Sequence, residues 1–394
     1  MRATRSVFLT DAQQRKTLAA VRSLGRKGIY IGAGEETRMA TALFSKYCRR
    51  SLVYPSPRRY PEGFLKSLLK FLRANPFEVV FPMDDEALLH IARHKEEFES
   101  LTRIPIPGHA TLLLARDKAK TLELAREAGL VCPRTMTPHS LEDEELKELA
   151  NSLDFPVVIK PRESSGSRGI CYVFSKEDLI PVYHQVHNNY PFPMIQEYVP
   201  PGEKYDVCLL FNPNSVVRAA FVQKELREYP LTGGPSTLQE SVKRPELVNM
   251  AVALMQRIGW YGVCEVEFMI DPRDGRPMFM EVNPRFWASL QMAIDCGVDF
   301  PYLLYRMAMD GDVEPVFEYE VGLRCRWLLP GDILHFLANP KRWEMKPGFF
   351  NFWDPKTKDD IISLSDPGPT LGFFLACCRY IFDPVMWRFV VTRR

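Results

Sequence analysis

The chain lacks the features that mark several large protein classes. Its nine cysteines include no CxxC pair, which indicates neither a zinc site nor a disulfide framework and favours reduced thiols in the cytoplasm. No run of about 18 uninterrupted apolar residues occurs, so we expect no membrane-spanning helix. The N-terminus, MRATRSVFLTD, has no long apolar core and predicts no secretory signal. A net charge of +2 without a dense Lys/Arg cluster gives no argument for nucleic-acid binding.

Familiar nucleotide and metal motifs are absent as well. No Gly-Lys-Ser/Thr follows a glycine loop at Walker A spacing. Gly32-Ala33-Gly34 lacks the third glycine of a dinucleotide fingerprint, so we interpret it as a tight turn. His90 and His94 stand one helical turn apart, but the charged residues around them favour a solvated helix face over a metal site.

The order of apolar runs predicts α/β and α+β domains. SVFLTD, GIYIGAG and SLVYPSP predict strands, and FEVVFPMDDEALLHIARHKEEF predicts a strand that runs into a helix. Strands that alternate with helices indicate a parallel α/β layer. With 394 residues, two or three packed units are expected. The predicted divisions are an N-terminal α/β domain, a lobe with a lysine and a glycine-rich loop, a second lobe, and a C-terminal extension of unassigned architecture, at residues 1–110, 111–200, 201–314 and 315–394.

Several elements follow the N-terminal domain. TLLLARDKAKTLELAREAGL predicts one amphipathic helix that ends at Gly129. PMIQEYVPPGEKYDVCLLF predicts two strands across a Pro-Gly turn, and LTGGPSTLQESV predicts a loop. YGVCEVEFMI and RPMFMEVNPR predict a hairpin, because the DPRDG between them contains a strong Asp-Gly turn signal.

A lysine before a glycine-serine loop is the first candidate site. Lys160 ends the apolar strand FPVVIKP, and the loop ESSGSRG follows at once. Backbone N–H groups around Gly166 and Gly169 can cradle phosphate oxygens, with Lys160 and Arg168 supplying positive charge. The lysine precedes the loop, which is the reverse of the protein-kinase order. The alternative is a surface lysine beside a linker.

The predicted hairpin carries the second candidate site. Glu265 and Glu267 share one strand face, and Glu281 and Asn283 share a face across the turn. If Glu267 lies opposite Glu281, the two carboxylates repel unless a cation lies between them. Carboxylate and amide oxygens suit magnesium that bridges nucleotide phosphates. The alternative, a pair of solvent-facing acids, is weakened by the anion-binding charge of Arg285 at the end of the same row.

These segments, in this order, resemble the ATP-grasp superfamily over roughly residues 110 to 310. The motifs that carry the resemblance are RDK, FPVVIKPRESSGSRG, MIQEYVPPGEKYD, ELREYPLTGGPST, CEVEF and FMEVNPRFWAS. They are most similar to the carbamoyl-phosphate-synthase-like and carboxylate–amine ligase branch, and the N-terminal α/β unit suits the domain that commonly precedes this fold. Ala288 departs from the glycine that relatives often carry, and its methyl group is expected to narrow the substrate pocket without touching the metal.

The resemblance implies a role for each matching residue. The ATP phosphates are assigned to Lys118 and Lys160 and to the loop Ser164, Ser165, Gly166, Ser167, Arg168 and Gly169. Glu197 and Val199 are assigned to the adenine edge and Glu203 to the ribose. Magnesium is assigned to Glu267, Glu281 and Asn283, and the phosphorylated intermediate to Arg285. The acceptor site is assigned to Lys224, Arg227 and the loop Gly233 to Ser236.

The resemblance also implies a reaction, with ATP and Mg2+ (or Mn2+) as cofactors. A carboxylate is phosphorylated by ATP, and an amine captures the acyl phosphate to give an amide, ADP and phosphate. Two alternatives stay open. One is activation of bicarbonate or carbamate, and the other is a nucleotide-binding regulatory module without turnover.

Two further segments admit two interpretations each. Asp84, Asp85 and Glu86 follow a strand and precede a helix, where N-capping is expected and a substrate-side role is the alternative. Residues 371–391, LGFFLACCRYIFDPVMWRFVV, predict a docked C-terminal helix, with peripheral membrane or partner contact as the alternative. We expect small-molecule carboxylate and amine substrates and no nucleic-acid partner, and a homodimer stays open.

Overall fold

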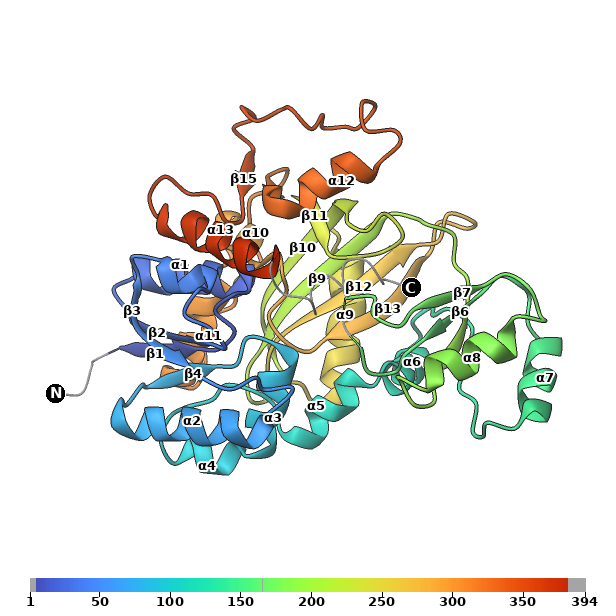
Figure 1. Cartoon of the computed structure of the whole chain (residues 1–394), viewed down its shortest axis with the longest axis horizontal. Coiled ribbons are helices and arrows are strands. Elements are labelled where there is room, and N and C mark those ends of the chain that lie inside the picture. The colour runs from blue at the N-terminus through green and yellow to red at the C-terminus, as the bar shows by residue number, and fades with distance from the viewer. Residues whose placement is uncertain (1–4, 165, 382–394) are drawn as a thin grey trace.

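The computed structural model describes residues 5–164 and 166–381 and arranges them around three β-sheets (Figure 1). The strand orders are β3-β2-β1-β4, β5-β8-β6-β7 and β13-β12-β9-β10-β11-β14-β15. The first sheet is parallel, and the other two are antiparallel apart from the β14–β15 pair. The predicted fold class, a parallel α/β domain before two lobes with antiparallel sheets, is confirmed.

The N-terminal domain is a parallel sheet with helices on both faces (Figure 1). Every residue of β1 is buried, as expected for a parallel strand covered on both sides. The strands are β1 (Ser6–Leu9), β2 (Tyr30–Glu35), β3 (Cys48–Val53) and β4 (Val79–Phe81). The helices are α1 (Arg15–Arg26), η1 (Thr41–Phe44), α2 (Pro61–Ala74), α3 (Asp85–Arg93) and α4 (Lys95–Glu99).

The expected tight turn at Gly32-Ala33-Gly34 is wrong, because these residues lie inside β2. A Cβ on Gly32 would lie 2.4 Å from the ring of Phe77, and one on Gly34 would lie 2.6 Å from the ring of Tyr54. The two glycines therefore allow aromatic side chains to approach the strand closely, a role that glycine also has in strand interiors elsewhere.

The second sheet and two helices form a small lobe with its own apolar core, at the right of Figure 1. Its strands are β5 (Thr135–Met136), β6 (Val157–Lys160), β7 (Cys171–Val173) and β8 (Met194–Glu197). Its helices are α7 (Asp143–Asn151) and α8 (Leu179–His187). Lys160 is the last residue of β6, as predicted.

The single helix predicted before Gly129 is in fact two helices, α5 (His109–Arg116) and α6 (Lys118–Glu127). Asp117 breaks them, because its backbone is extended and its carboxylate accepts hydrogen bonds from the N–H groups of Ala119 and Lys120. An aspartate that caps the next helix outweighs the continuous apolar period. The break puts Lys118 at the first position of α6.

The large sheet forms the second lobe and corrects two predictions. The two strands predicted across the Pro-Gly turn, β8 and β9, both form, but they do not pair with each other because they belong to different sheets. Residues 236–241, predicted as loop, form β11, whose inward side chains are largely polar and so conceal the strand period. The strands are β9 (Lys204–Phe211), β10 (Val217–Glu228), β11 (Ser236–Ser241), β12 (Gly262–Ile270), β13 (Pro277–Asn283), β14 (Arg324–Arg326) and β15 (Thr357–Asp359). The helices are α9 (Pro245–Ile258), α10 (Leu290–Asp295) and α11 (Phe300–Asp310).

The C-terminal region completes the large sheet with β14 and β15 and then returns to the N-terminal domain. It adds the helices η2 (Leu328–Asp332), α12 (Ile333–Ala338) and α13 (Gly368–Ile381). Arg22 pairs with Asp366 at 3.0 Å, and α13 packs on η1. Residues 382–391 of the aromatic segment lie outside the described residues. Within residues 5–164 and 166–381, no helix is both long and apolar enough to cross a membrane.

Asp332 joins the C-terminal region to the large sheet. Its fully buried carboxylate accepts from Arg227 at 2.7 Å and from Arg326 at 2.6 Å. Asp332→Ala would leave both guanidinium groups buried without their acid, and we expect it to lower the free energy of unfolding by about 3–5 kcal/mol. Urea unfolding measures the change.

The control is Asp310→Ala, which removes an exposed acid that pairs with Arg306 on α11. Exposed pairs of this kind contribute at most about 1 kcal/mol. Equal losses of stability in the two variants would contradict the structural role of Asp332.

Candidate functional site

The hairpin of β12 and β13 is the centre of the site. Glu265 pairs with Asn283, and Glu267 pairs with Glu281, which is the register that the sequence predicts. β9 lies on the other side of β12 and places Asp206 opposite Glu267. Asp206 was not among the predicted site residues, although a charged residue that interrupts the apolar strand YDVCLLF is a usable signal.

Two buried lysines from other elements meet this hairpin. Lys160, at the end of β6, places its Nζ 3.2 Å from Oε2 of Glu281. Lys118, at the start of α6, places its Nζ 3.6 Å from the same oxygen. Three segments far apart in the sequence thus bring two cations to one carboxylate. Removed from solvent, such charges interact strongly with each other and with any anion between them.

Burial and neighbouring charges shift the pKa values of the two facing carboxyl groups, Glu267 and Glu281, in opposite directions. Burial, followed by the negative charge of Glu281, raises the pKa of Glu267 to about 8. Burial opposes ionisation of Glu281 as well, but the ammonium groups of Lys160 and Lys118 lower its pKa to about 2. Without a cation, the pair therefore holds one charge near neutral pH.

The residues present fit a magnesium ion that is shared with phosphate. Asn283 donates from Nδ2 to Glu267 at 2.6 Å and to Glu265 at 3.0 Å. A 180° turn of this amide would present its oxygen to the same space. Among the described residues, no group of three or more His, Cys, Asp or Glu side chains could hold a metal. Magnesium commonly takes one or two carboxylates and completes its shell with water and substrate phosphates, so two carboxylates and one amide suffice.

Arg285 is held by acids of the N-terminal domain. Its Nε lies 3.0 Å from Oδ2 of Asp85 and 3.6 Å from Oδ1 of Asp84. Asp84 also accepts from the buried Lys16 at 2.7 Å. Burial opposes ionisation of Asp85, but the guanidinium of Arg285 holds its pKa well below its ordinary value.

The expected N-cap role of Asp84 is wrong. Asp84 occupies the N-cap position of α3, but its side chain makes no capping hydrogen bond. Its carboxylate turns to Lys16 and Arg285 instead, because a partly buried acid gains more from two cations than from a backbone N–H. The alternative of a role at the site is the one that the geometry favours.

The glycine-serine loop lies over the same region. Gly166 and Ser167 have φ values of +63° and +58°, a left-handed run that turns successive N–H groups to one side. The carbonyl oxygen of Ser164 accepts from Lys118, which ties the loop to the lysine pair. A Cβ on Gly233 would lie 3.7 Å from Oγ of Ser167, so the predicted acceptor loop adjoins this one. Ser165 lies outside the described residues.

The residues assigned to the adenine edge lie on the segment that connects the small lobe to the large sheet. Glu197 accepts from the backbone N–H of Arg134 at 3.0 Å, and Arg273 donates to its other oxygen at 2.9 Å. Val199 is buried in a small apolar cluster beside Met269. This segment borders both the small lobe and the large sheet.

The two basic residues assigned to the acceptor site lie apart from each other. Lys224 donates to Glu203, the residue assigned to the ribose, and Glu203 also accepts from Tyr205 at 2.6 Å. Arg227 is buried against Asp332 in the C-terminal region. The structure therefore places Lys224 beside Glu203 and Arg227 beside Asp332, and the roles of both basic residues stay predictions.

Residues 115–289 match the family model of the ATP-grasp domain. The mitochondrial acetyl-CoA carboxylase of Saccharomyces cerevisiae is 29% identical over 178 residues, which are 42% of this chain and 8% of that protein. The carbamoyl phosphate synthase large chain of Halomonas eurihalina is 24% identical over 190 residues, which are 46% of this chain and 17% of that protein. The aligned region is thus a small part of each relative.

Solved structures resemble a larger part of the chain. The biotin carboxylase domain of Hydrogenobacter thermophilus 2-oxoglutarate carboxylase has a TM-score of 0.69 at 17% identity, covering 82% of this chain and 74% of its own. N5-carboxyaminoimidazole synthetase of Staphylococcus aureus has a TM-score of 0.63 at 16% identity, covering 82% of each chain. L-amino acid ligase of Bacillus licheniformis has a TM-score of 0.60 at 17% identity, covering 80% and 79%. These likenesses establish the fold, and the family model shows an ATP-grasp domain over residues 115–289.

Proposed function

We propose that this protein is an ATP- and Mg2+-dependent ligase that activates a carboxylate as an acyl phosphate for attack by an amine. The observation that carries the proposal is the convergence of Lys118 and Lys160 on Glu281. Two cations beside a carboxylate form a site that holds a phosphate group and a divalent ion together. The products are an amide, ADP and phosphate.

Different residues of the chain would bind the phosphates, the adenine and the ribose of ATP. Lys118 and Lys160 bind phosphate oxygens and neutralise charge that develops during transfer. The loop around Gly166 and Ser167 donates backbone N–H groups and excludes water. Glu197 and Val199 receive the adenine edge. Glu203, already within reach of Lys224, accepts ribose hydroxyls.

Glu267, Glu281 and Asn283 would hold magnesium. The ion, when bound, neutralises phosphate charge and removes the repulsion between the two carboxylates. Arg285 lies next in the row and donates to Oδ1 of Asn283 at 3.3 Å. It would orient the substrate carboxylate and then the acyl phosphate.

A second candidate function is activation of bicarbonate. The S. cerevisiae and H. eurihalina relatives are an acetyl-CoA carboxylase and a carbamoyl phosphate synthase, and the H. thermophilus structure contains bicarbonate with ADP. A third is a nucleotide-binding module without turnover. Retention of Lys160, both hairpin acids and Arg285 argues against it.

Phosphate release by the purified protein separates the three. ATP and magnesium are combined with crossed pools of carboxylates and amines, and in a separate arm with bicarbonate alone. The ligase proposal expects release only when a carboxylate and an amine are both present. Release with bicarbonate alone favours the second candidate, and ATP binding without release in any arm favours the third.

Asp85 should affect activity through Arg285. Asp85→Asn replaces a charge-assisted contact by a neutral one, and the expected loss of about 1.5–3 kcal/mol corresponds to a fall in kcat of roughly 10- to 150-fold. The KM for ATP should change less than kcat, because the ion-pair partners of Asp85 among the described residues are Arg285 and Arg116, whereas Lys118 and Lys160 pair with Glu281. Steady-state kinetics give both values.

Glu86→Gln, one residue further along α3, is the matched control and should retain the kcat of the wild type. If Asp85→Asn raised the KM for ATP and left kcat unchanged, the assignment of Arg285 to the carboxylate side would be contradicted.

A further inference from the structure

One stretch of the N-terminal domain is strongly basic, and none of its residues has a role in the proposed reaction. Residues 37–77 contain nine Lys and Arg residues and one acid, Glu62, in a chain whose net charge is +2. The nine are spread over 41 positions, so they form no dense cluster in the sequence. All nine are exposed.

Their charges are largely uncompensated. Of the nine, only Arg73 has an ion-pair partner among the described residues, the exposed Glu97. We name the part that surrounds β3 the basic edge. It consists of Arg38, Lys46, Arg49, Arg50, Arg58 and Arg59, and β3 is the outermost strand of its sheet.

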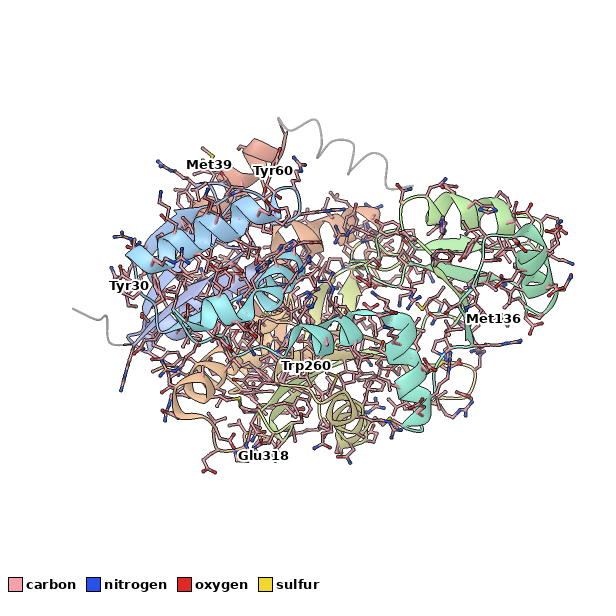
Figure 2. All side chains as sticks on the ribbon, turned by 90° about the horizontal axis from the view of Figure 1, so that it is seen from below. Tyr30, Met39, Tyr60, Met136, Trp260 and Glu318 are labelled. Atoms are coloured by element: carbon pink, nitrogen blue, oxygen red, sulfur yellow. The ribbon has the colours of Figure 1, made fainter. Side chains whose placement is uncertain are left out.

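Exposed apolar side chains lie among these cations. Met39 is 46% exposed, Val53 44% and Tyr60 64%. Met39 and Tyr60 project at the same edge of the molecule in Figure 2. Arg38 and Val53 also line one hollow of about 520 Å3 with Ser51 and two residues of η1.

Helix α13 extends this surface. A Cβ on Gly372 would lie 2.5 Å from the ring of Phe44, so the helix packs closely on η1. Its outer side chains Leu371 and Phe374 are 58% and 51% exposed. The basic edge therefore borders an apolar helix face.

We propose that the basic edge and α13 together bind the surface of a membrane that contains anionic lipids. Unpaired arginines supply attraction to the headgroups, and exposed Met, Val, Tyr, Leu and Phe side chains supply apolar contact with the acyl boundary. Nucleic acid would use the same charges but gains little from aliphatic side chains, since its partners are phosphates and base edges. Residues 382–394 contain three arginines and one aspartate, so charge does not favour them as the cover of this surface.

Co-sedimentation of the full chain with lipid vesicles tests the proposal. The probes are neutral phosphatidylcholine vesicles and vesicles with about 30% phosphatidylserine. We expect binding to the anionic vesicles alone and release at high salt. Reversing four charges, in Arg49→Glu, Arg50→Glu, Arg58→Glu and Arg59→Glu together, should lower the partition coefficient at least about a hundred-fold. Replacing the same four by lysine should retain binding.

A matched control reverses four exposed lysines of the C-terminal region, at positions 341, 346, 356 and 358, and should bind anionic vesicles like the wild type. Thermal unfolding and ATP-dependent activity should be unchanged in all variants, because none of these residues lies in the ATP site. The proposal is overturned if the wild type ignores anionic vesicles, if both reversals lose binding equally, or if the protein binds duplex DNA or RNA through these arginines and does not bind vesicles.

Leu371→Ser with Phe374→Ser separates insertion from adsorption. If α13 contributes apolar contact, this variant loses the part of the binding that survives moderate salt and keeps the binding at low salt. No difference from the wild type at either salt concentration would remove α13 from the surface.

Discussion

Glu281→Gln is expected to lower Mg2+-dependent ADP formation at least about a thousand-fold while the fold survives. The substitution keeps the size of the side chain but removes the charge that faces Lys118, Lys160 and Glu267. The two lysines then repel each other, and the hairpin loses the negative charge of one metal ligand. Coupled measurement of ADP gives the rate, and circular dichroism reports the fold.

Asp274→Asn is the control on the same hairpin. Asp274 lies in the turn, where its partner is the nearby Arg276. It should keep the rate of the wild type. Turnover by Glu281→Gln at the rate of the control would remove Glu281 from the proposed metal site.

Lys160→Ala should weaken ATP binding by roughly 10- to 150-fold, the equivalent of one charge-assisted contact of about 1.5–3 kcal/mol. The lysine lies at the end of a buried strand, where its ion-pair partner among the described residues is Glu281. The effect on turnover should be larger than that on binding, because charge grows on the transferred group. Isothermal titration calorimetry with ATP and magnesium measures the affinity.

Lys147→Ala, on α7 of the same lobe, removes an exposed lysine whose ion-pair partner in the described part of the chain is Glu144. Its ATP affinity should equal that of the wild type. An unaltered affinity in Lys160→Ala would place the phosphates elsewhere.

The hairpin was predictable because its signals are local. The Asp-Gly turn fixes the register of Phe268 to Ile270 against Pro277 to Phe279. A β-bulge between Glu267 and Phe268 then brings Glu267 opposite Glu281, and this bulge has no clear signal in the sequence. Lys160 was predictable for a similar reason, since an apolar strand that ends in lysine before a glycine loop is a short continuous pattern.

Other features depend on contacts between distant segments. Asp84 and Asp85 have ordinary helix-start sequences, and contacts with distant cations turn them toward the site, Lys16 for Asp84 and Arg285, 200 positions later, for Asp85. Gly32 resembles a turn residue until the ring of Phe77 is known to lie against it. β11 has Ser, Thr and Gln side chains directed into the core, so its strand period is invisible to hydrophobicity.

The C-terminal region shows the same limit. Its aromatic and proline-rich sequence gives no clear period, yet β14 and β15 extend the large sheet. The sheet pairing that organises it comes from β11, and the ion pairs that fix it involve Arg15, Arg22 and Arg227. The predicted divisions at residues 110, 200 and 314 stay a proposal.

Transfer of oxygen from the carboxylate to phosphate tests the central claim most directly. The carboxylate and amine that support phosphate release are supplied with 18O in the carboxylate, and the phosphate is analysed by mass spectrometry. Activation as an acyl phosphate predicts one 18O atom in each phosphate released, because the bridging oxygen stays with phosphorus when the amine attacks the carbonyl. Phosphate without the label, formed at the same rate as the amide, would contradict it.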